Sequence, residues 1–188
     1  MILVLAGVVH SGKTTFLRKL LPSVEALRLP VCGYLSPLVM VEGRAAGYDL
    51  FDIRKGQAIP FLRTEGEAGW QKVGPFFFLP GGLEAATAAI RGRRPGETLI
   101  VDEVGPVEFS GRGVWPALKE VFSKPSLNCI LVVRTPLLSD LRGKLGNQQV
   151  EVFDIAANDA LRALLMRLSK TALSSRMGQP VRRSRAGS

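Results

Sequence analysis

A segment near the start of the chain has the residue types and spacing of a loop that binds phosphate groups. Residues 7–14 match the pattern G-x-x-x-x-G-K-[ST]. The glycines let the backbone curl so that successive N–H groups point at one anion, and a following helix adds its positive amino end. The pattern predicts that Lys13 neutralises the β- and γ-phosphates of a nucleotide and that the Thr14 hydroxyl binds Mg²⁺. We expect nucleotide contacts from Gly7, Val8, Val9, His10, Ser11, Gly12, Lys13, Thr14 and Thr15.

Two adjacent acids follow a hydrophobic run later in the chain. The apolar residues 99–101 lead directly to Asp102 and Glu103. A buried strand that ends in an acid forms the second half of the magnesium site in proteins with this loop, so we expect Asp102 to bind the ion together with Thr14. We expect Glu103 to polarise water as a general base for attack on the γ-phosphate. Lys13 and Glu103 are therefore the predicted catalytic residues.

Strand and helix patterns alternate around these residues, which predicts an α/β fold with a mostly parallel sheet flanked by helices. Short apolar runs indicate strands at residues 2–6, 31–35, 98–101, 128–133 and 150–155. Helical apolar spacing occurs in residues 14–21, and Pro22 is expected to end that helix. Further helices are expected at residues 83–90, 114–122, 139–145 and 158–168.

Two parts of the chain differ from this pattern. Residues 36–80 consist of short apolar or alternating runs between turns, which predicts an antiparallel, β-rich insertion in a domain of residues 1–169. Residues 170–188 carry basic side chains, no acids, and many serines and glycines. We interpret them as a basic, disordered tail, and as the only part of the chain expected to contact nucleic acid.

The composition excludes several classes of protein. Hydrophobic residues make up 46% and charged residues 22%, as in an ordinary folded protein. Two cysteines and a single histidine cannot build a disulfide scaffold or a zinc cluster. No apolar run approaches the ~20 residues of a membrane span, and the first residues lack the marks of a signal peptide. We therefore expect a cytoplasmic protein with no membrane partner.

The segment that follows the two acids carries the most specific pattern. Residues 101–108, V-D-E-V-G-P-V-E, are similar to the signature D-E-[IV]-G-P-[MV]-E. Together with residues 7–15, the Gly33-Tyr34 pair and residues 47–53, they make the chain resemble the small P-loop nucleoside-triphosphatases. That family includes the cancer-related NTPase and its archaeal and thermophilic relatives.

The resemblance covers roughly residues 1–168 and implies a RecA-like P-loop NTPase fold with added antiparallel strands. It also implies slow, Mg²⁺-dependent hydrolysis of ATP, GTP and other nucleoside triphosphates to diphosphate and phosphate. The signature extends the expected nucleotide contacts to Val104, Gly105 and Pro106. Residues 35–38 and 134–136 differ from the family, which often has a threonine and an acid at the first place and a histidine at the second. The substrate range therefore stays open.

Three further side chains or groups have two interpretations each. Arg134 follows a predicted strand, where it could sense the γ-phosphate or be an ordinary surface arginine. Glu108 could orient the catalytic loop or pair with a basic residue. The aromatic residues 76–78 could stack on a base or divide between the core and a neighbouring face.

Two other functions compete with triphosphate hydrolysis. A kinase would share the phosphate loop and pass the γ-phosphate to a small acceptor. A nucleotide-binding adaptor would bind without catalysis. The adjacent acids Asp102 and Glu103 favour water as the nucleophile, and the lack of an N-K-x-D motif gives no support for guanine specificity.

Overall fold

A computed structural model describes residues 1–124 and 126–177 of the chain. The strands are β1 (Ile2–Gly7), β2 (Val31–Leu35), β3 (Leu38–Val41), β4 (Arg44–Asp52), β5 (Gln57–Arg63), β6 (Lys72–Val73), β7 (Phe76–Phe78), β8 (Thr98–Val101), β9 (Asn128–Arg134) and β10 (Val150–Asp154). The helices are α1 (Lys13–Ala26), α2 (Pro80–Arg91), α3 (Pro106–Phe109), α4 (Trp115–Phe122), α5 (Leu138–Leu145) and α6 (Ala160–Met177), and a 3-10 turn at Thr135–Leu137 precedes α5.

Among the described residues these strands form one sheet, in the order β10-β1-β9-β8-β2-β4-β5-β7-β6, with β3 paired to β4. The members from β10 to β2 are mutually parallel, and they are the strands predicted from the apolar runs. From β4 onward the pairing is antiparallel, as predicted for the insertion. The insertion therefore extends the parallel sheet.

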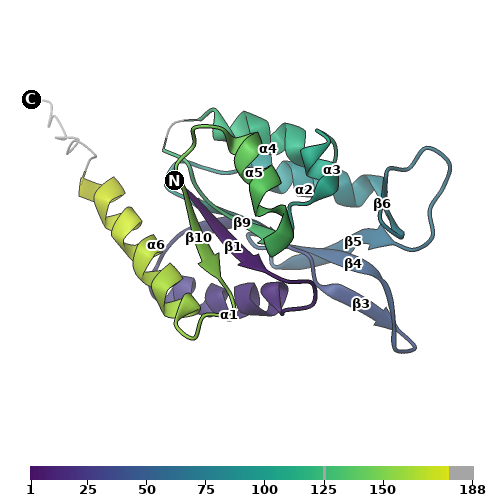
Figure 1. The fold of residues 1–188 in the computed structure, drawn as a ribbon, viewed down its shortest axis with the longest axis horizontal. Coiled ribbons are helices and arrows are strands. Elements are labelled where there is room, and N and C mark those ends of the chain that lie inside the picture. Colours follow the sequence, from purple (N-terminus) through teal and green to yellow (C-terminus); the bar gives the residue numbers. More distant parts are fainter. Residues whose placement is uncertain (125, 178–188) are drawn as a thin grey trace, which may run out of the picture.

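Helices cover both faces of the sheet (Figure 1). On one face, α2, α4 and α5 pack over side chains that include Ile2 and Val4; on the other, α1 and α6 pack over Leu3 and Leu5. Successive side chains of a strand point to opposite faces, so the unbroken apolar run of β1 supplies both cores. The predicted α/β fold is confirmed.

Two predicted helix ends are wrong. Helix α1 continues through Pro22 to Ala26, because proline removes only one backbone hydrogen bond there and the buried Leu20 and Val24 hold both sides of it against the sheet. Helix α6 continues to Met177, so residues 170–177 are helical and do not belong to a disordered tail. Residues 178–188 of that predicted tail lie outside the described residues.

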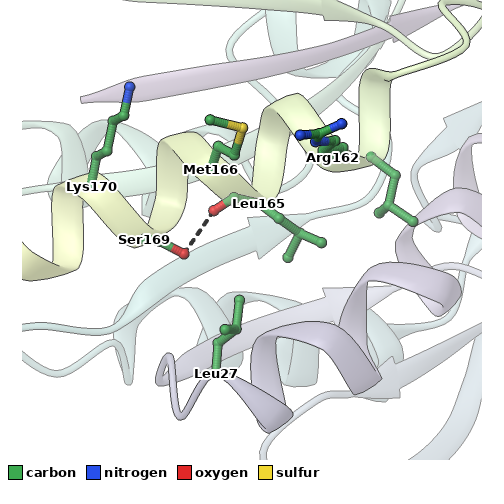
Figure 2. Close-up of a pocket in the computed structure, with 7 residues that line it drawn as sticks. Leu27, Arg162, Leu165, Met166, Ser169 and Lys170 are labelled. Atoms are coloured by element: carbon green, nitrogen blue, oxygen red, sulfur yellow. Dashed lines mark hydrogen bonds between the residues drawn. The ribbon is translucent and has the colours of Figure 1, made fainter.

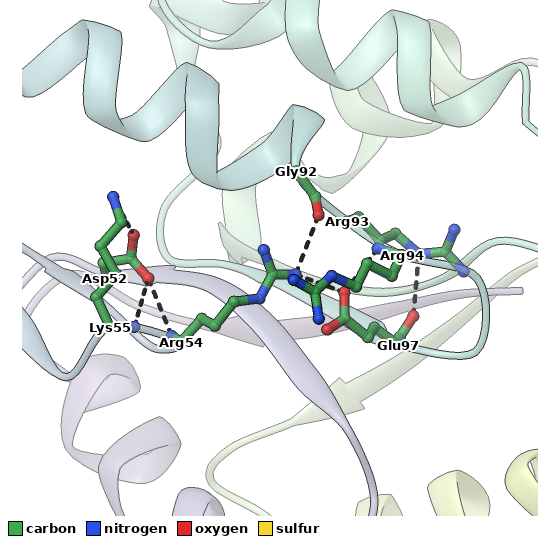
Figure 3. A network of polar contacts seen from close by, with 7 residues as sticks. All are labelled: Asp52, Arg54, Lys55, Gly92, Arg93, Arg94 and Glu97. Carbon is green, nitrogen blue, oxygen red and sulfur yellow. Dashed lines mark hydrogen bonds and ion pairs between the residues drawn. The ribbon is translucent and has the colours of Figure 1, made fainter.

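Polar contacts at the amino end of β8 join the insertion to the parallel half of the sheet (Figure 3). Arg54, after β4, donates from Nη2 to Glu97 Oε2 at 2.6 Å and to the Gly92 carbonyl at 3.1 Å. Asp52 Oδ1 accepts the backbone N–H groups of Arg54 and Lys55. These contacts fix the turn after β4 against the start of β8.

In the described part of the chain, no helix is both long and apolar enough for a membrane span.

Candidate active site

The sheet brings the predicted phosphate loop and the predicted acids to one edge. Strands β1 and β8 are both parallel to β9, which lies between them. Their carboxyl ends therefore lie on the same side, and the loop after Gly7 comes close to Asp102. A ligand site at the carboxyl edge of parallel strands is the general arrangement in open α/β sheets.

The loop of residues 8–12 curls tightly before α1. His10 and Gly12 have left-handed backbones, with φ of 59° and 85°. Lys13 Nζ lies inside the curl, where it donates to the Val8 carbonyl at 2.7 Å and the Gly7 carbonyl at 3.3 Å. Burial lowers the pKa of Lys13, and the nearby Glu103 carboxylate offsets part of this shift. The ammonium group is thus held at the first turn of α1, where backbone N–H groups attract anions.

Asp102 and Thr14, the two predicted metal ligands, lie in contact. Asp102 is 3% exposed, and its carboxylate accepts hydrogen bonds from the Thr14 side chain and, at 2.9 Å, from the Ser36 backbone N–H. Burial raises the pKa of Asp102 to about 6, against the opposing effect of those two hydrogen bonds. The structure therefore places one hydroxyl and one carboxylate side by side at the end of β8.

This pair of oxygen donors fits Mg²⁺. The ion prefers oxygen ligands and is usually bound through one or two carboxylates plus phosphate oxygens and water. Within residues 1–124 and 126–177, no three His, Cys, Asp or Glu side chains gather into a complete metal cage. The donor set thus suits an ion that arrives with a phosphate better than one held by protein alone.

Glu103 is paired with Arg134. Arg134 Nε and Nη2 lie 2.7 and 2.5 Å from Glu103 Oε1, and both side chains are partly exposed. Arg134 is opposite Gly7 in the β1–β9 register, so it lies beside the start of the phosphate loop, and its charge acts on Lys13. Glu103 also has a left-handed backbone, with φ of 72°. Such a conformation is uncommon outside glycine, and it turns the side chain away from the path of β8.

Glu108 lies beneath the loop that follows the acids. Its carboxylate accepts the Gly105 N–H at 3.0 Å and the Val114 N–H at 3.5 Å. Burial raises the pKa of Glu108 to about 7, although these backbone hydrogen bonds oppose the shift. Of the two predicted roles, the contacts match the one that orients the loop.

The three predicted nucleotide contacts after Glu103 lie in a short, anchored segment. The Val104 side chain is fully buried in the core, and its N–H donates to the Val132 carbonyl at 2.7 Å. Val104 therefore anchors the loop, and neither its side chain nor its N–H is available to a ligand. Gly105 and Pro106 begin α3, a short helix that the apolar spacing did not predict.

Comparison with known proteins identifies the family. The family model described as NTPase matches residues 2–165. The chain belongs to this NTPase family. Among curated members, the nucleoside-triphosphatase THEP1 of Pyrobaculum islandicum is 33% identical over 63% of this chain and 66% of its own length. The THEP1 of Ignicoccus hospitalis is 29% identical over 57% of this chain and 60% of its own length. The matched part of the chain thus spans about two thirds or less of the length of these two relatives.

Solved structures agree with the NTPase assignment at the level of fold. A human cancer-related nucleoside triphosphatase has a TM-score of 0.69 and 23% identity, over 92% of this chain and 97% of that one. THEP1 from the hyperthermophile Aquifex aeolicus has a TM-score of 0.63 and 18% identity, over 89% and 99%. The RecA-like P-loop fold expected from the resemblance is confirmed.

Ser36 and Tyr48 also lie near the two acids, although no local motif predicts a role for them. Ser36 follows β2, donates its N–H to Asp102 and donates its hydroxyl to the Asp102 carbonyl at 3.3 Å. Its position follows from the parallel pairing of β2 with β8, which brings the end of β2 beside Asp102. Tyr48 lies in the insertion, where burial raises its pKa and the Glu103 charge adds to the shift. That proximity depends on how the insertion folds back.

A depression away from this edge lacks the groups that phosphate chemistry needs. It measures about 490 Å³ and lies between the end of α1 and α6 (Figure 2). Its lining is mostly apolar, and Ser169 within it is bonded to the Leu165 carbonyl at 2.9 Å. None of its lining residues comes from the phosphate loop or from the acidic segment, and none is a carboxylate. The candidate active site is therefore the edge that holds Lys13, Asp102 and Glu103.

Proposed function

We propose that this protein hydrolyses nucleoside triphosphates to diphosphate and phosphate with Mg²⁺ as cofactor. One observation carries the proposal. The phosphate loop, the contact between Thr14 and Asp102, and the Glu103 carboxylate lie next to one another at one edge of the sheet. Membership of the NTPase family and the names of the THEP1 relatives support the same activity.

The loop would bind the substrate through its phosphates. Backbone N–H groups at the start of α1 and the Lys13 ammonium face the β- and γ-phosphates, and Lys13 exchanges its bonds to loop carbonyls for bonds to phosphate oxygens. Thr14 and Asp102 would hold Mg²⁺, which neutralises the charge that develops on the phosphates when it is bound. This recognition involves no base, so we expect ATP, GTP and other triphosphates to be substrates.

Glu103 would act on the water. Its carboxylate takes a proton as the water oxygen bonds to the γ-phosphorus and the bond to the bridging oxygen breaks. In the structure Arg134 holds this carboxylate, and a bound γ-phosphate offers the guanidinium a more highly charged partner. Transfer of Arg134 to the phosphate would free Glu103 for catalysis, which combines the predicted sensor role of Arg134 with the observed ion pair.

Phosphate release tests the proposal. Purified protein is incubated with ATP, GTP, CTP or UTP, with Mg²⁺ or with EDTA, and without any acceptor. We expect release of phosphate with several nucleotides, and its loss in EDTA. Lys13→Ala should abolish turnover, whereas Lys19→Ala, in the same helix but away from the loop, should retain it. Phosphate release by Lys13→Ala at the parent rate would contradict the assignment.

A further inference from the structure

A pocket of about 270 Å³ lies beside Asp102 and Glu103, on the side away from the phosphate loop. Most of its lining comes from the end of β2, from strands β4 to β7 and from residues 102–108, with Arg134 at the end of β9; none of the lining residues belongs to residues 7–15. The strand order explains this position, because β9, β8 and β2 separate β1 from the insertion. A triphosphate held on the loop with its terminal phosphate toward Asp102 would therefore end at the mouth of the pocket.

The pocket walls are strongly aromatic. Tyr34, Phe61 and Phe78 form a chain of edge-to-face contacts with ring centroids 5.7 and 5.2 Å apart. Tyr48 and Phe76 form a second edge-to-face pair at 5.4 Å. All of these rings line the pocket. Such walls suit a flat ring that can stack on them or meet their edges.

The charges in the pocket favour a neutral ligand. Glu103 and Glu108 line it together with Asp102, and Arg134 is the only cation among the lining residues. Arg134 is already paired with Glu103. A ligand with its own phosphate would meet more negative than positive charge here. Hydroxyl groups, by contrast, could use the carboxylates, Ser36 and the tyrosine hydroxyl groups as partners.

The size sets a further limit. About 270 Å³ is slightly below the ~300–1,000 Å³ of pockets that hold drug-sized molecules. The pocket therefore suits a small molecule with one flat ring system and a compact polar group. A nucleoside combines a flat base with a neutral, hydroxyl-bearing sugar, and so matches the walls, the charge and the size.

We propose that this pocket binds a neutral nucleoside as an acceptor for the γ-phosphoryl group. The inference rests on the proposed placement of the triphosphate. The nucleoside hydroxyl oxygen forms a bond to the γ-phosphorus while the bond between that phosphorus and the β–γ bridging oxygen breaks. The hydroxyl proton passes to Glu103, and the products are a nucleoside monophosphate and a nucleoside diphosphate. Glu103 lines the pocket as well as facing the loop, so one carboxylate serves either water or the acceptor.

The test is product analysis with the full chain. The protein is incubated with ATP and Mg²⁺, with and without millimolar adenosine, guanosine, cytidine, uridine or thymidine. Nucleoside monophosphate, diphosphate and free phosphate are then quantified by mass spectrometry and by a phosphate assay. We expect at least one nucleoside to become phosphorylated, with less free phosphate released per ATP consumed.

Adjacent residues of β7 provide a matched pair of variants. Phe76 lines the pocket, and Phe77 faces the other way, with Lys72 Nζ 5.3 Å from its ring centroid. Phe76→Ala should lower the ratio of transferred to hydrolysed phosphate by about tenfold or more, because it removes a ring on which the base can stack. Phe77→Ala should keep the parent ratio. Equal ratios in the two variants would overturn the assignment of the pocket.

The outcomes separate this inference from the proposed hydrolysis. Phosphate release from ATP alone, with no phosphorylated nucleoside in any reaction, would overturn the acceptor proposal and leave the hydrolase standing. Phosphorylated nucleoside without phosphate release from ATP alone would support the acceptor and overturn the hydrolase. Nucleosides that only slow hydrolysis, without becoming phosphorylated, would also overturn the acceptor proposal.

Discussion

Two neighbouring acids have different environments, and these environments give them different chemistry. Asp102 is buried and accepts hydrogen bonds from Thr14 and Ser36. Glu103 is about a third exposed, turns out of the strand with φ of 72° and pairs with Arg134. A fixed, buried carboxylate oxygen is suited to bind a metal ion, and a partly exposed carboxylate can reach water.

Substitution of the two acids should separate their roles. Asp102→Asn should weaken Mg²⁺-dependent nucleotide binding and turnover together, each by about tenfold or more, because the carboxylate charge that would hold the ion is lost. Glu103→Gln should leave affinity within a few-fold and lower turnover by roughly 10²–10⁴-fold, because the amide cannot accept the proton. Titration with a slowly hydrolysed ATP analogue and single-turnover hydrolysis measure the two effects. Parent-like turnover of Glu103→Gln would rule out this base and make Glu108 the next candidate.

Glu108 should make stability depend on pH. Its pKa is raised from 4.5 to about 7 in the fold, so the folded protein binds its proton more tightly than the unfolded chain. The stabilisation is therefore fully present below pH 4.5 and is lost as pH rises toward 7, by up to about 3 kcal/mol. The free energy of unfolding, measured with urea, should fall between pH 4.5 and pH 8 in the parent. Glu108→Gln should remove the part of that fall that Glu108 causes.

The comparison isolates one group, because the raised pKa of Asp102 acts in both the parent and the variant. Glu65→Gln removes an exposed acid and controls for the loss of one charge. Parallel stability profiles for the parent and Glu108→Gln would contradict the prediction.

At the scale of elements, β2 joins the two halves of the sheet. It pairs in parallel with β8 and antiparallel with β4. Its end also carries Ser36, which bonds Asp102. Close approach of β2 to β8 is therefore needed for both the sheet and the site, and Gly33 makes that approach. Its φ is 103°, and a Cβ there would lie 2.0 Å from the Ile100 carbonyl oxygen.

Gly33→Ala should destabilise the protein by about 3 kcal/mol or more, since the clash is with backbone of the paired strand. For a chain of this length, that corresponds to a melting temperature lower by roughly 6–12 °C. Gly43→Ala is the matched control. Its φ of 74° is also left-handed, but a Cβ there would meet nothing within 4 Å, so only about 1–2 kcal/mol is expected. Equal losses in thermal unfolding would show that the clash at Gly33 is relieved by a shift of the strand.

At the scale of the whole molecule, the strands of the candidate active site and the strands of the insertion belong to one continuous sheet. The parallel half supplies the phosphate loop and the acids, and the antiparallel half supplies the aromatic walls beside them. Cys32 in β2 and Cys129 in β9 lie on either side of β8, in the buried middle of this sheet. Both thiols are free, and burial raises the pKa of each to about 12.

The two thiols should report global unfolding. In the native protein we expect neither to react with a disulfide reagent at mildly alkaline pH, because each is about 1% exposed or less and stays protonated. In denaturant both should react quickly. Under native conditions their slow reaction rates should be equal, since exposure of either thiol requires the central strands to separate. Faster reaction of one thiol would reveal local opening on that side of β8.

Local patterns determined a large part of this structure. The phosphate loop, the acids after residue 101 and the parallel strands could all be predicted from the sequence, because each depends on neighbouring residues and on burial of a short apolar run. Helix ends were predicted less well. Packing of Leu20 and Val24 against the sheet carries α1 past Pro22, and α6 continues through residue 170, where the sequence pattern predicted a tail.

Only the tertiary structure decided which distant side chains meet. Ser36 and Asp102 are 66 residues apart in sequence, and Glu103 and Arg134 are 31 apart. Their contacts follow from the order of β9, β8 and β2 in the sheet, and the loop-like segment around Ser36 has no local pattern that announces it. The aromatic pocket likewise depends on the insertion folding back beside the acids. Strand order is set by the packing of the whole core, and one-dimensional periodicity does not contain it.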